Sequence, residues 1–86
     1  MEAHMSALID EVRAELSLPG PDIARQIREA AGVSQSRLAA ALGVHSLTVA
    51  RWESGARIPH GDLRRAYARL LAELDQATRE AQAAPP

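Results

Sequence analysis

One stretch, residues 33–59, constrains the fold of this 86-residue chain more than any other. Residues 34–42 begin with a serine that can cap a helix N-terminus, and their apolar side chains recur at helical spacing. Gly43 then offers the left-handed conformation that a sharp reversal requires at little steric cost. A second helix is expected over about residues 45–54, because Gly55 can end it and the proline that closes the stretch bars its continuation. The stretch therefore predicts two short helices joined by a glycine turn.

The second of these helices presents two different faces. Val49 and Trp52, three residues apart, would face a core with Thr48 beside them. Leu47 and Arg51 share the other face. Such a face suits the major groove of DNA, where arginine can bind O6 and N7 of guanine and an alkyl side chain can touch a thymine methyl. The solvated surface of a small helical domain would look the same, so the helical wheel alone leaves both interpretations open.

Composition excludes several classes of protein. With 86 residues, 47% of them apolar, the chain makes one small domain, and the absence of cysteine excludes disulfides and thiolate metal sites. No apolar run approaches the roughly 20 residues that span a bilayer, and no signal-peptide pattern opens the chain, so a cytoplasmic protein without a membrane partner is expected. His4, His45 and His60 are scattered, without a carboxylate pair or a phosphate-binding glycine loop. We therefore expect no enzyme, no catalytic residue, no cofactor and no metal.

The formal net charge of −1 conceals a segregation along the chain. Residues 1–22 have a net charge of −4, residues 23–69 a net charge of +5 from eight Arg and three acids, and residues 70–86 a net charge of −2. A polyanionic partner for the middle segment fits this distribution. Charges on solvated helix faces would also produce it.

An amphipathic helix is expected at the N-terminus, over about residues 6–18 with Ser6 as a candidate cap. Its large apolar side chains, here called the N-terminal stripe, are Met5, Leu8, Ile9, Val12 and Leu16. They could belong to the core of the domain or bind a partner protein. We expect core, because a small domain needs apolar side chains and because Pro19-Gly20-Pro21 is a connector short enough to fold the helix back.

Two further helices complete the expected domain. One would be capped by Asp22 and closed by Gly32, with Ile23, Ile27 and Ala30 or Ala31 inward and Arg25, Gln26 and Glu29 in water. The last would begin near His60 or Gly61, with Asp62 in its first turn. Its apolar seam comprises Leu63, Ala66, Tyr67, Leu70, Leu71 and Leu74. The expected organisation is an N-terminal helix with its connector over residues 1–21, packed on a domain of residues 22–76, and a frayed tail over residues 77–86.

Many positions at fixed spacing resemble one family. They are Ile27-Arg28, Gly32-Val33-Ser34-Gln35, Leu38-Ala39, Leu42-Gly43-Val44, Thr48-Val49, Arg51-Trp52-Glu53, Gly55, Arg57 and Pro59. Over residues 22–74 the chain resembles the phage repressor and Cro type of helix-turn-helix, also called the xenobiotic-response-element family. The resemblance implies an all-α fold, a compact five-helix bundle of the lambda-repressor-like type with the N-terminal amphipathic helix added.

The resemblance also assigns roles to residues of the two short helices. Residues 34–42 become the scaffold helix, and residues 45–54 become the recognition helix. Ser46, Leu47 and Arg51 take the positions that usually reach base edges. Gln35 takes a position that points at a phosphate from a helix N-terminus. His45 departs from the usual Ser or Thr cap, so it either caps less well or contacts a phosphate or base.

Positions outside the recognition helix receive roles in the same way. Arg57, His60 and Arg64 are candidates for the neighbouring phosphates, whereas Arg65 and Arg69 are expected in solvent. Arg28 and Glu53 correspond to a structural ion pair between the first helix of the domain and the recognition helix. Trp52 is expected in the core.

The function implied is that of a sequence-specific transcriptional regulator, Cro-like or a small repressor, which binds a double-stranded DNA operator. Such proteins generally bind as symmetric dimers. A homodimer could form through the C-terminal helix, near Leu71 and Leu74, or only on DNA. Two alternatives are a protein-interaction module, such as an antitoxin or adaptor, and a phage recombination directionality factor on the same fold.

Overall fold

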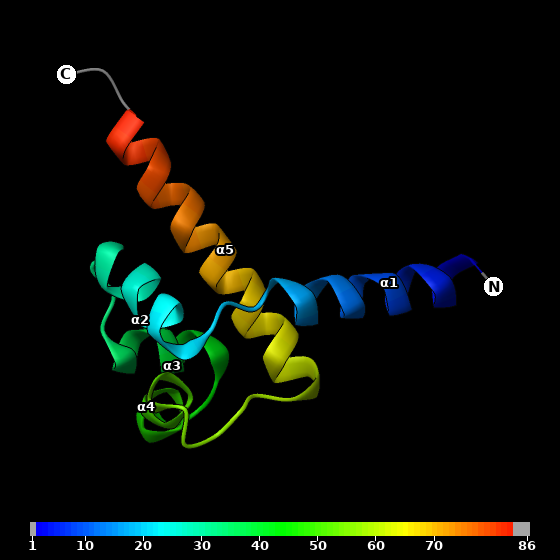
Figure 1. Cartoon of the computed structure of the whole chain (residues 1–86), viewed down its shortest axis with the longest axis horizontal. Coiled ribbons are helices and arrows are strands. Elements are labelled where there is room, and N and C mark those ends of the chain that lie inside the picture. Colours follow the sequence, from blue (N-terminus) through cyan, green and yellow to red (C-terminus); the bar gives the residue numbers. More distant parts are fainter. Residues whose placement is uncertain (1, 84–86) are drawn as a thin grey trace.

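The computed structural model describes residues 2–83 and contains five helices over that range. In chain order they are α1 (Glu2–Ser17), α2 (Pro21–Ala30), α3 (Gln35–Leu42), α4 (Ser46–Ser54) and α5 (Gly61–Ala83). Helices α2 to α4 gather at one end of α5, whereas α1 lies across α5 and extends away from them (Figure 1). No strand occurs in the described part of the chain, which confirms the all-α class.

The two short helices and their turn form as the sequence predicts. The hydroxyl of Ser34 accepts the backbone N–H of Arg37 at 3.1 Å and so caps α3. Gly43 ends α3 with φ +71°, and Gly55 ends α4 with φ +80°. Both values lie in the left-handed region that an L side chain rarely adopts, which is why glycine occupies both positions.

The core lies where α4 and α5 meet α2 and α3. Its buried apolar residues are Ala24, Leu38, Ala39, Val49, Trp52, Tyr67 and Leu71. The rings of Trp52 and Tyr67 are tilted by 36° with centroids 4.8 Å apart, a separation at which aromatic pairs attract. The inward direction of Val49 and Trp52 is therefore confirmed, and it fixes the opposite face of α4 as the outward one.

Helix α2 differs in two respects from the expectation. Gly20, not Asp22, occupies the N-cap position, since Pro21 with its fixed φ begins the helix and Asp22 falls within the first turn. Ile23 is half exposed, and the inward face is formed by buried Ala24 and Arg28 with Ile27 beside them. The buried side of α2 is set by how the helix packs on its neighbours, which periodicity alone does not reveal.

Helix α1 also differs from the expectation. It begins at Glu2, before the expected cap Ser6, and none of its residues is buried. The expectation that the N-terminal stripe belongs to the core is wrong, because all five of its side chains are exposed. The helix contacts α5 through its opposite face, where Glu11 forms an ion pair with Arg65.

Helix α5 is longer than expected. It stays helical to Ala83, so the frayed tail expected from residue 77 is wrong as far as the structure describes it, and residues 84–86 lie outside the described range. Tyr67, Ala68 and Leu71 are buried along its inner face, whereas Leu63 is exposed. None of the helices within residues 2–83 has the length and apolar character needed to cross a membrane.

Candidate nucleic-acid interface

The outward face of α4 carries side chains with no internal role. Leu47 and Arg51, four residues apart and therefore neighbours on the helix surface, are both exposed, and Ser46 is half buried in the first turn. Within the described residues, the Arg51 side chain makes neither a hydrogen bond nor an ion pair. The structure thus brings the three base-contacting candidates onto one short helix and leaves a cation and an alkyl group in solvent.

His45 is the N-cap of α4, a role that the sequence left open. Its Nδ1 atom accepts the backbone N–H of Leu47 at 3.2 Å. Because Nδ1 accepts, the neutral ring carries its hydrogen on Nε2, which can donate to an anion. His45 is exposed, so the ring can cap the helix and present a donor at the same time.

The loop after α4 is fixed to the end of that helix. The backbone N–H of Arg57 donates to the carbonyl oxygen of Arg51 at 3.2 Å. The hydroxyl of Ser54 donates to the same carbonyl at 3.1 Å and accepts the N–H of Ala56 at 3.3 Å. Arg57 is exposed, and among the described residues its guanidinium has no partner. This arrangement holds a second free cation next to α4.

A buried charged network fixes α4 from its inner side. Arg28 donates from Nε to Oε2 of Glu53 at 2.6 Å and from Nη2 to Oε1 at 2.9 Å, a bidentate pair. Its Nη1 atom donates to the carbonyl oxygen of Val33 at 2.8 Å. The ion pair that the resemblance implies is therefore present, and it joins α2, the turn before α3, and α4.

The network also contains Gln35, which the sequence did not indicate. Nε2 of Gln35 donates to Oε1 of Glu53 at 3.1 Å, so the amide at the start of α3 is held by α4. Burial by itself raises the pKa of Glu53. The hydrogen bonds from Arg28 and Gln35, together with the positive charges of Arg28 and Arg25, outweigh that effect and leave the pKa below its usual value. The hydrogen bond to Glu53 raises the pKa of Arg28. Both groups are thus held in their charged forms.

Two arginines of α5 do not lie as expected. Arg64 donates from Nη1 to the carbonyl oxygen of Pro59 at 3.3 Å and from Nη2 to that of Glu15 at 3.2 Å, so its guanidinium holds α1 and is not presented to a phosphate. Arg65, expected in solvent, pairs with Glu11 and Asp62. His60 is exposed, as a phosphate contact requires, and Arg69 is exposed as expected.

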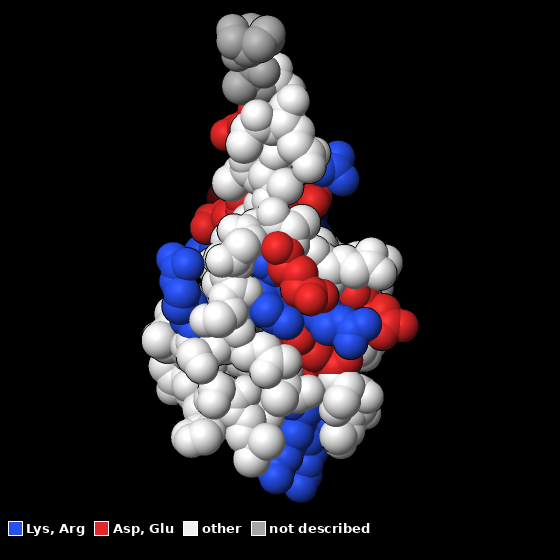
Figure 2. Space-filling view, turned by 90° about the vertical axis from the view of Figure 1, so that its left-hand side faces the viewer, with Lys and Arg blue, Asp and Glu red and all other residues white. Residues whose placement is uncertain are grey.

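The surface charge around α4 differs from the rest of the visible face. At its lower end, where α4 lies, Figure 2 shows basic side chains without acidic ones, while acidic and basic side chains are mixed across the middle. The acids of residues 1–22 belong largely to α1, away from α4. The charge segregation seen in the sequence therefore has a spatial counterpart, which suits an anionic partner.

Comparison with known proteins gives one match. A helix-turn-helix family model matches residues 25–74, more than half of the chain, and these residues include α3, its glycine turn and α4. Neither the curated proteins nor the solved structures contain a match to this chain. The chain therefore belongs to the helix-turn-helix family of the phage repressor and Cro type, whose members are DNA-binding transcription regulators.

Proposed function

We propose that the chain is a sequence-specific, Cro-like regulator or small repressor that inserts α4 into the major groove of an operator. The observation that carries this proposal is the division of α4 into two faces. Its inner face is fixed by Val49, Trp52 and the Glu53 network, whereas its outer face presents Leu47 and Arg51 without internal partners.

The outer face offers two chemically distinct base contacts. Arg51 can donate to O6 and N7 of one guanine, a bidentate contact worth roughly 1–3 kcal/mol of discrimination against other bases. Leu47, one turn before Arg51, can contact a thymine methyl. The hydroxyl of Ser46 can donate a hydrogen bond to a base edge or accept one from it. Together they can distinguish a short base sequence.

The phosphate contacts surround α4 on several sides. Gln35 retains one free amide N–H and its carbonyl oxygen at the N-terminus of α3, where the helix dipole favours an anion. His45 offers its Nε2–H group beside the first turn of α4. Arg57 offers a cation after the last turn of α4, and exposed His60, three residues later, offers a further phosphate contact on the same side. These contacts position the protein without reading sequence. Arg64 is left out of this set because its guanidinium binds two carbonyl oxygens of the protein.

Substitution of Arg51 tests the base-reading role. Selection from a random duplex pool supplies the preferred operator, and binding of Arg51→Ala is then measured on that operator and on a scrambled duplex at several salt concentrations. Arg79→Ala is the matched control, since it removes the same charge from an exposed position late in α5. The C-terminal end of α5 points away from α4 (Figure 1).

Arg51→Ala should change sequence specificity, whereas its control Arg79→Ala should not. We expect Arg51→Ala to weaken operator binding roughly 5- to 150-fold beyond its effect on the scrambled duplex. Gln35→Ala and Arg57→Ala should each weaken binding to both duplexes alike. Only Arg57→Ala removes a cation, so it alone should reduce the salt slope, by about 1. Equal losses on the two duplexes for Arg51→Ala would exclude it as a base reader.

A further inference from the structure

The N-terminal stripe contains five of the nine large apolar residues that are exposed among the described residues. Its five side chains retain between 44% and 82% of their accessible area. The other exposed large apolar residues, Ile23, Leu47, Ile58 and Leu63, are scattered over different elements. A continuous apolar stripe of this kind on a surface helix marks a binding surface.

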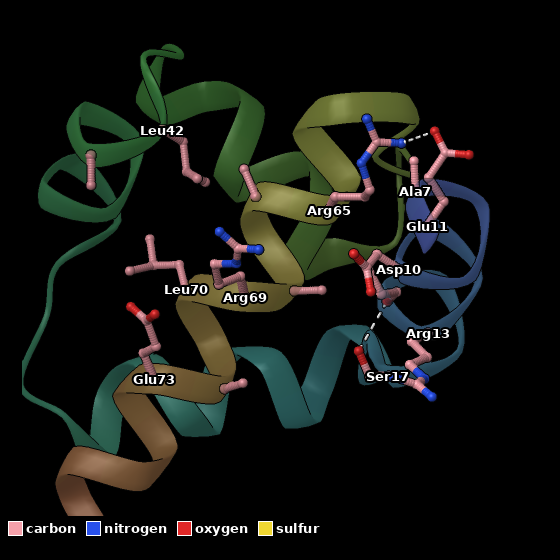
Figure 3. A pocket seen from close by; sticks show the side chains of 15 residues that line it. Ala7, Asp10, Glu11, Arg13, Ser17, Leu42, Arg65, Arg69, Leu70 and Glu73 are labelled. Atoms are coloured by element: carbon pink, nitrogen blue, oxygen red, sulfur yellow. Dashed lines mark hydrogen bonds and ion pairs between the residues drawn. The ribbon is translucent and has the colours of Figure 1, made fainter. Parts of the chain in front are cut away.

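The outward direction of the stripe is fixed by contacts on the other side of α1. A groove of about 820 Å³ lies between α1 and α5, and the α1 residues that line it are Ala7, Asp10, Glu11, Arg13, Ala14 and Ser17. No member of the stripe lines this groove (Figure 3). The Glu11–Arg65 ion pair and the hydrogen bond from Arg64 to the Glu15 carbonyl oxygen join α1 to α5 from that side. The helix is therefore anchored by its small and charged face, which leaves the large apolar face free.

The area of the stripe suits a second copy of the same chain. Because each of the five side chains keeps about half of its surface or more, pairing two stripes would remove on the order of 1,000 Å² from water in total. That is close to the smallest area at which specific interfaces form. In a two-fold symmetric dimer both copies contribute the same surface, so the stripe of one copy packs on the stripe of the other. One stripe per copy is therefore enough to bury this area.

The charges along the stripe are also self-complementary. On a helix of 3.6 residues per turn, Glu2 and Arg13 lie along one edge of the stripe, and His4 and Glu15 lie along the other. In an antiparallel pair, each edge faces the same edge of the other copy, read in the opposite direction. Glu2 then lies near the partner's Arg13, and His4 lies near the partner's Glu15. The same register places Met5 opposite the partner's Val12.

We propose that the N-terminal stripe is the dimer interface of this protein, in which α1 packs antiparallel against α1 of a second copy. The large apolar side chains fill the contact, and the two charged edges set its direction. The interface differs from the C-terminal helix that the sequence suggested, because the large side chains that end the seam of α5, Leu70, Leu71 and Leu74, are packed into or against the protein's own core.

The proposed pairing has a consequence for DNA binding, and this step alone rests on the proposed function. In the stated register the two Ser17 residues lie about 25 Å apart along the helix axes. The two bundles then occupy opposite ends of the pair. Separation on this scale suits two recognition helices that enter successive major grooves, about 34 Å apart.

Sedimentation equilibrium without DNA tests the interface. The wild-type chain should dimerise between about 1 μM and 1 mM, and Ile9→Glu/Val12→Glu should weaken the dimer at least ~100-fold, since each lost apolar anchor costs tenfold or more. Ile23→Glu is the control for adding a carboxylate elsewhere, because it places one such charge on an exposed isoleucine of α2. Both substituted positions on α1 are exposed, so far-UV circular dichroism should be unchanged. The urea midpoint should match that of the wild type at protein concentrations below the dimer dissociation constant, where no dimer stabilises the folded chain.

The outcomes are separable from those of the proposed function. A wild-type chain that is monomeric throughout this range would overturn the dimer and assign the stripe to a different protein partner. Unchanged association of Ile9→Glu/Val12→Glu would also overturn it. Neither result tests base reading by α4, which is measured separately with DNA and Arg51→Ala.

Disulfide crosslinking tests the direction of the pair, because the chain has no cysteine of its own. Met5→Cys/Val12→Cys should crosslink two copies on oxidation, whereas Met5→Cys alone should not. Positions seven residues apart on one helix are about 10 Å apart, too far for a disulfide within one copy. Efficient crosslinking of Met5→Cys alone would indicate a parallel pair and contradict the antiparallel arrangement.

Discussion

Removal of Glu53 should destabilise the protein more than removal of any exposed charge. The side chains of Arg28 and Glu53 are only 10% and 3% exposed, so solvent does little to screen the charge that the substitution leaves behind. In Glu53→Ala, Nε and Nη2 of Arg28 and Nε2 of Gln35 all lose their acceptor. Loss of one partner of such a pair costs about 3–5 kcal/mol of unfolding free energy.

That loss is large relative to the stability of a small domain. At roughly 0.05–0.15 kcal/mol per residue, a chain of this size has about 4–13 kcal/mol of unfolding free energy in all. Glu53→Gln is therefore a useful second variant, since it keeps one acceptor oxygen for Arg28 while it removes the negative charge. It should lower the free energy of unfolding by about 1.5–3 kcal/mol. Arg28→Met/Glu53→Leu removes both charges and should lie within ~2 kcal/mol of the wild type.

Urea unfolding followed by circular dichroism measures these differences, with the midpoint and slope fitted together. The expected order of stability is wild type close to the double variant, then Glu53→Gln, then Glu53→Ala. Two results would contradict this order: a loss of less than ~1 kcal/mol in Glu53→Ala, or a double variant as unstable as Glu53→Ala. Either result would mean that the network does not hold α4 in the way its geometry suggests.

Three further substitutions or conditions test separate parts of the structure. The pKa of Glu53 in the folded chain lies below its usual value of 4.5. The stability that its ionised form contributes is therefore complete above pH 4.5 and is lost as the pH falls below that value. In Glu53→Gln, the free energy of unfolding measured in urea should depend less on pH in that acid range. Gly43→Ala should lower stability by about 1–2 kcal/mol because φ is +71°, whereas Gly20→Ala, at φ −61° with open space around it, should change it little in the same urea assay. The hydroxyl of Tyr67 is buried with no partner among the described residues, so Tyr67→Phe should raise stability by about 1 kcal/mol; a loss instead would show that the hydroxyl is hydrogen-bonded. Because burial raises the pKa of Tyr67 to about 12, Tyr67→Phe should also remove part of the stability decline from pH 10 to 12.

Local sequence signals predicted the helix-turn-helix well. The caps at Ser34, Gly43 and Gly55 depend on neighbouring backbone groups and on the conformations that glycine permits, so they can be recognised without the rest of the fold. The inward direction of Val49 and Trp52 follows from helical spacing alone.

The features that sequence did not reveal depend on tertiary contacts. The periodicity of α1 indicates an apolar face but not what covers it, and the structure turns that face away from α5. Arg64 resembles a surface arginine until α1 brings the Glu15 carbonyl within reach, and Gln35 gains its partner only when α3 packs beside Glu53. For the same reason Ala24, not Ile23, lies in the core, because the buried side of α2 is decided by how that helix packs on the others.

Methylation interference on the selected operator tests most directly whether α4 reads the major groove through Arg51. Methylation of guanine N7 blocks one of the two acceptors that a bidentate arginine uses. N7 methylation of one guanine in each half-site should block binding of the wild-type chain and should have no effect on the residual binding of Arg51→Ala. Equal interference with the wild type and Arg51→Ala, or no interference with either, would contradict base reading by Arg51.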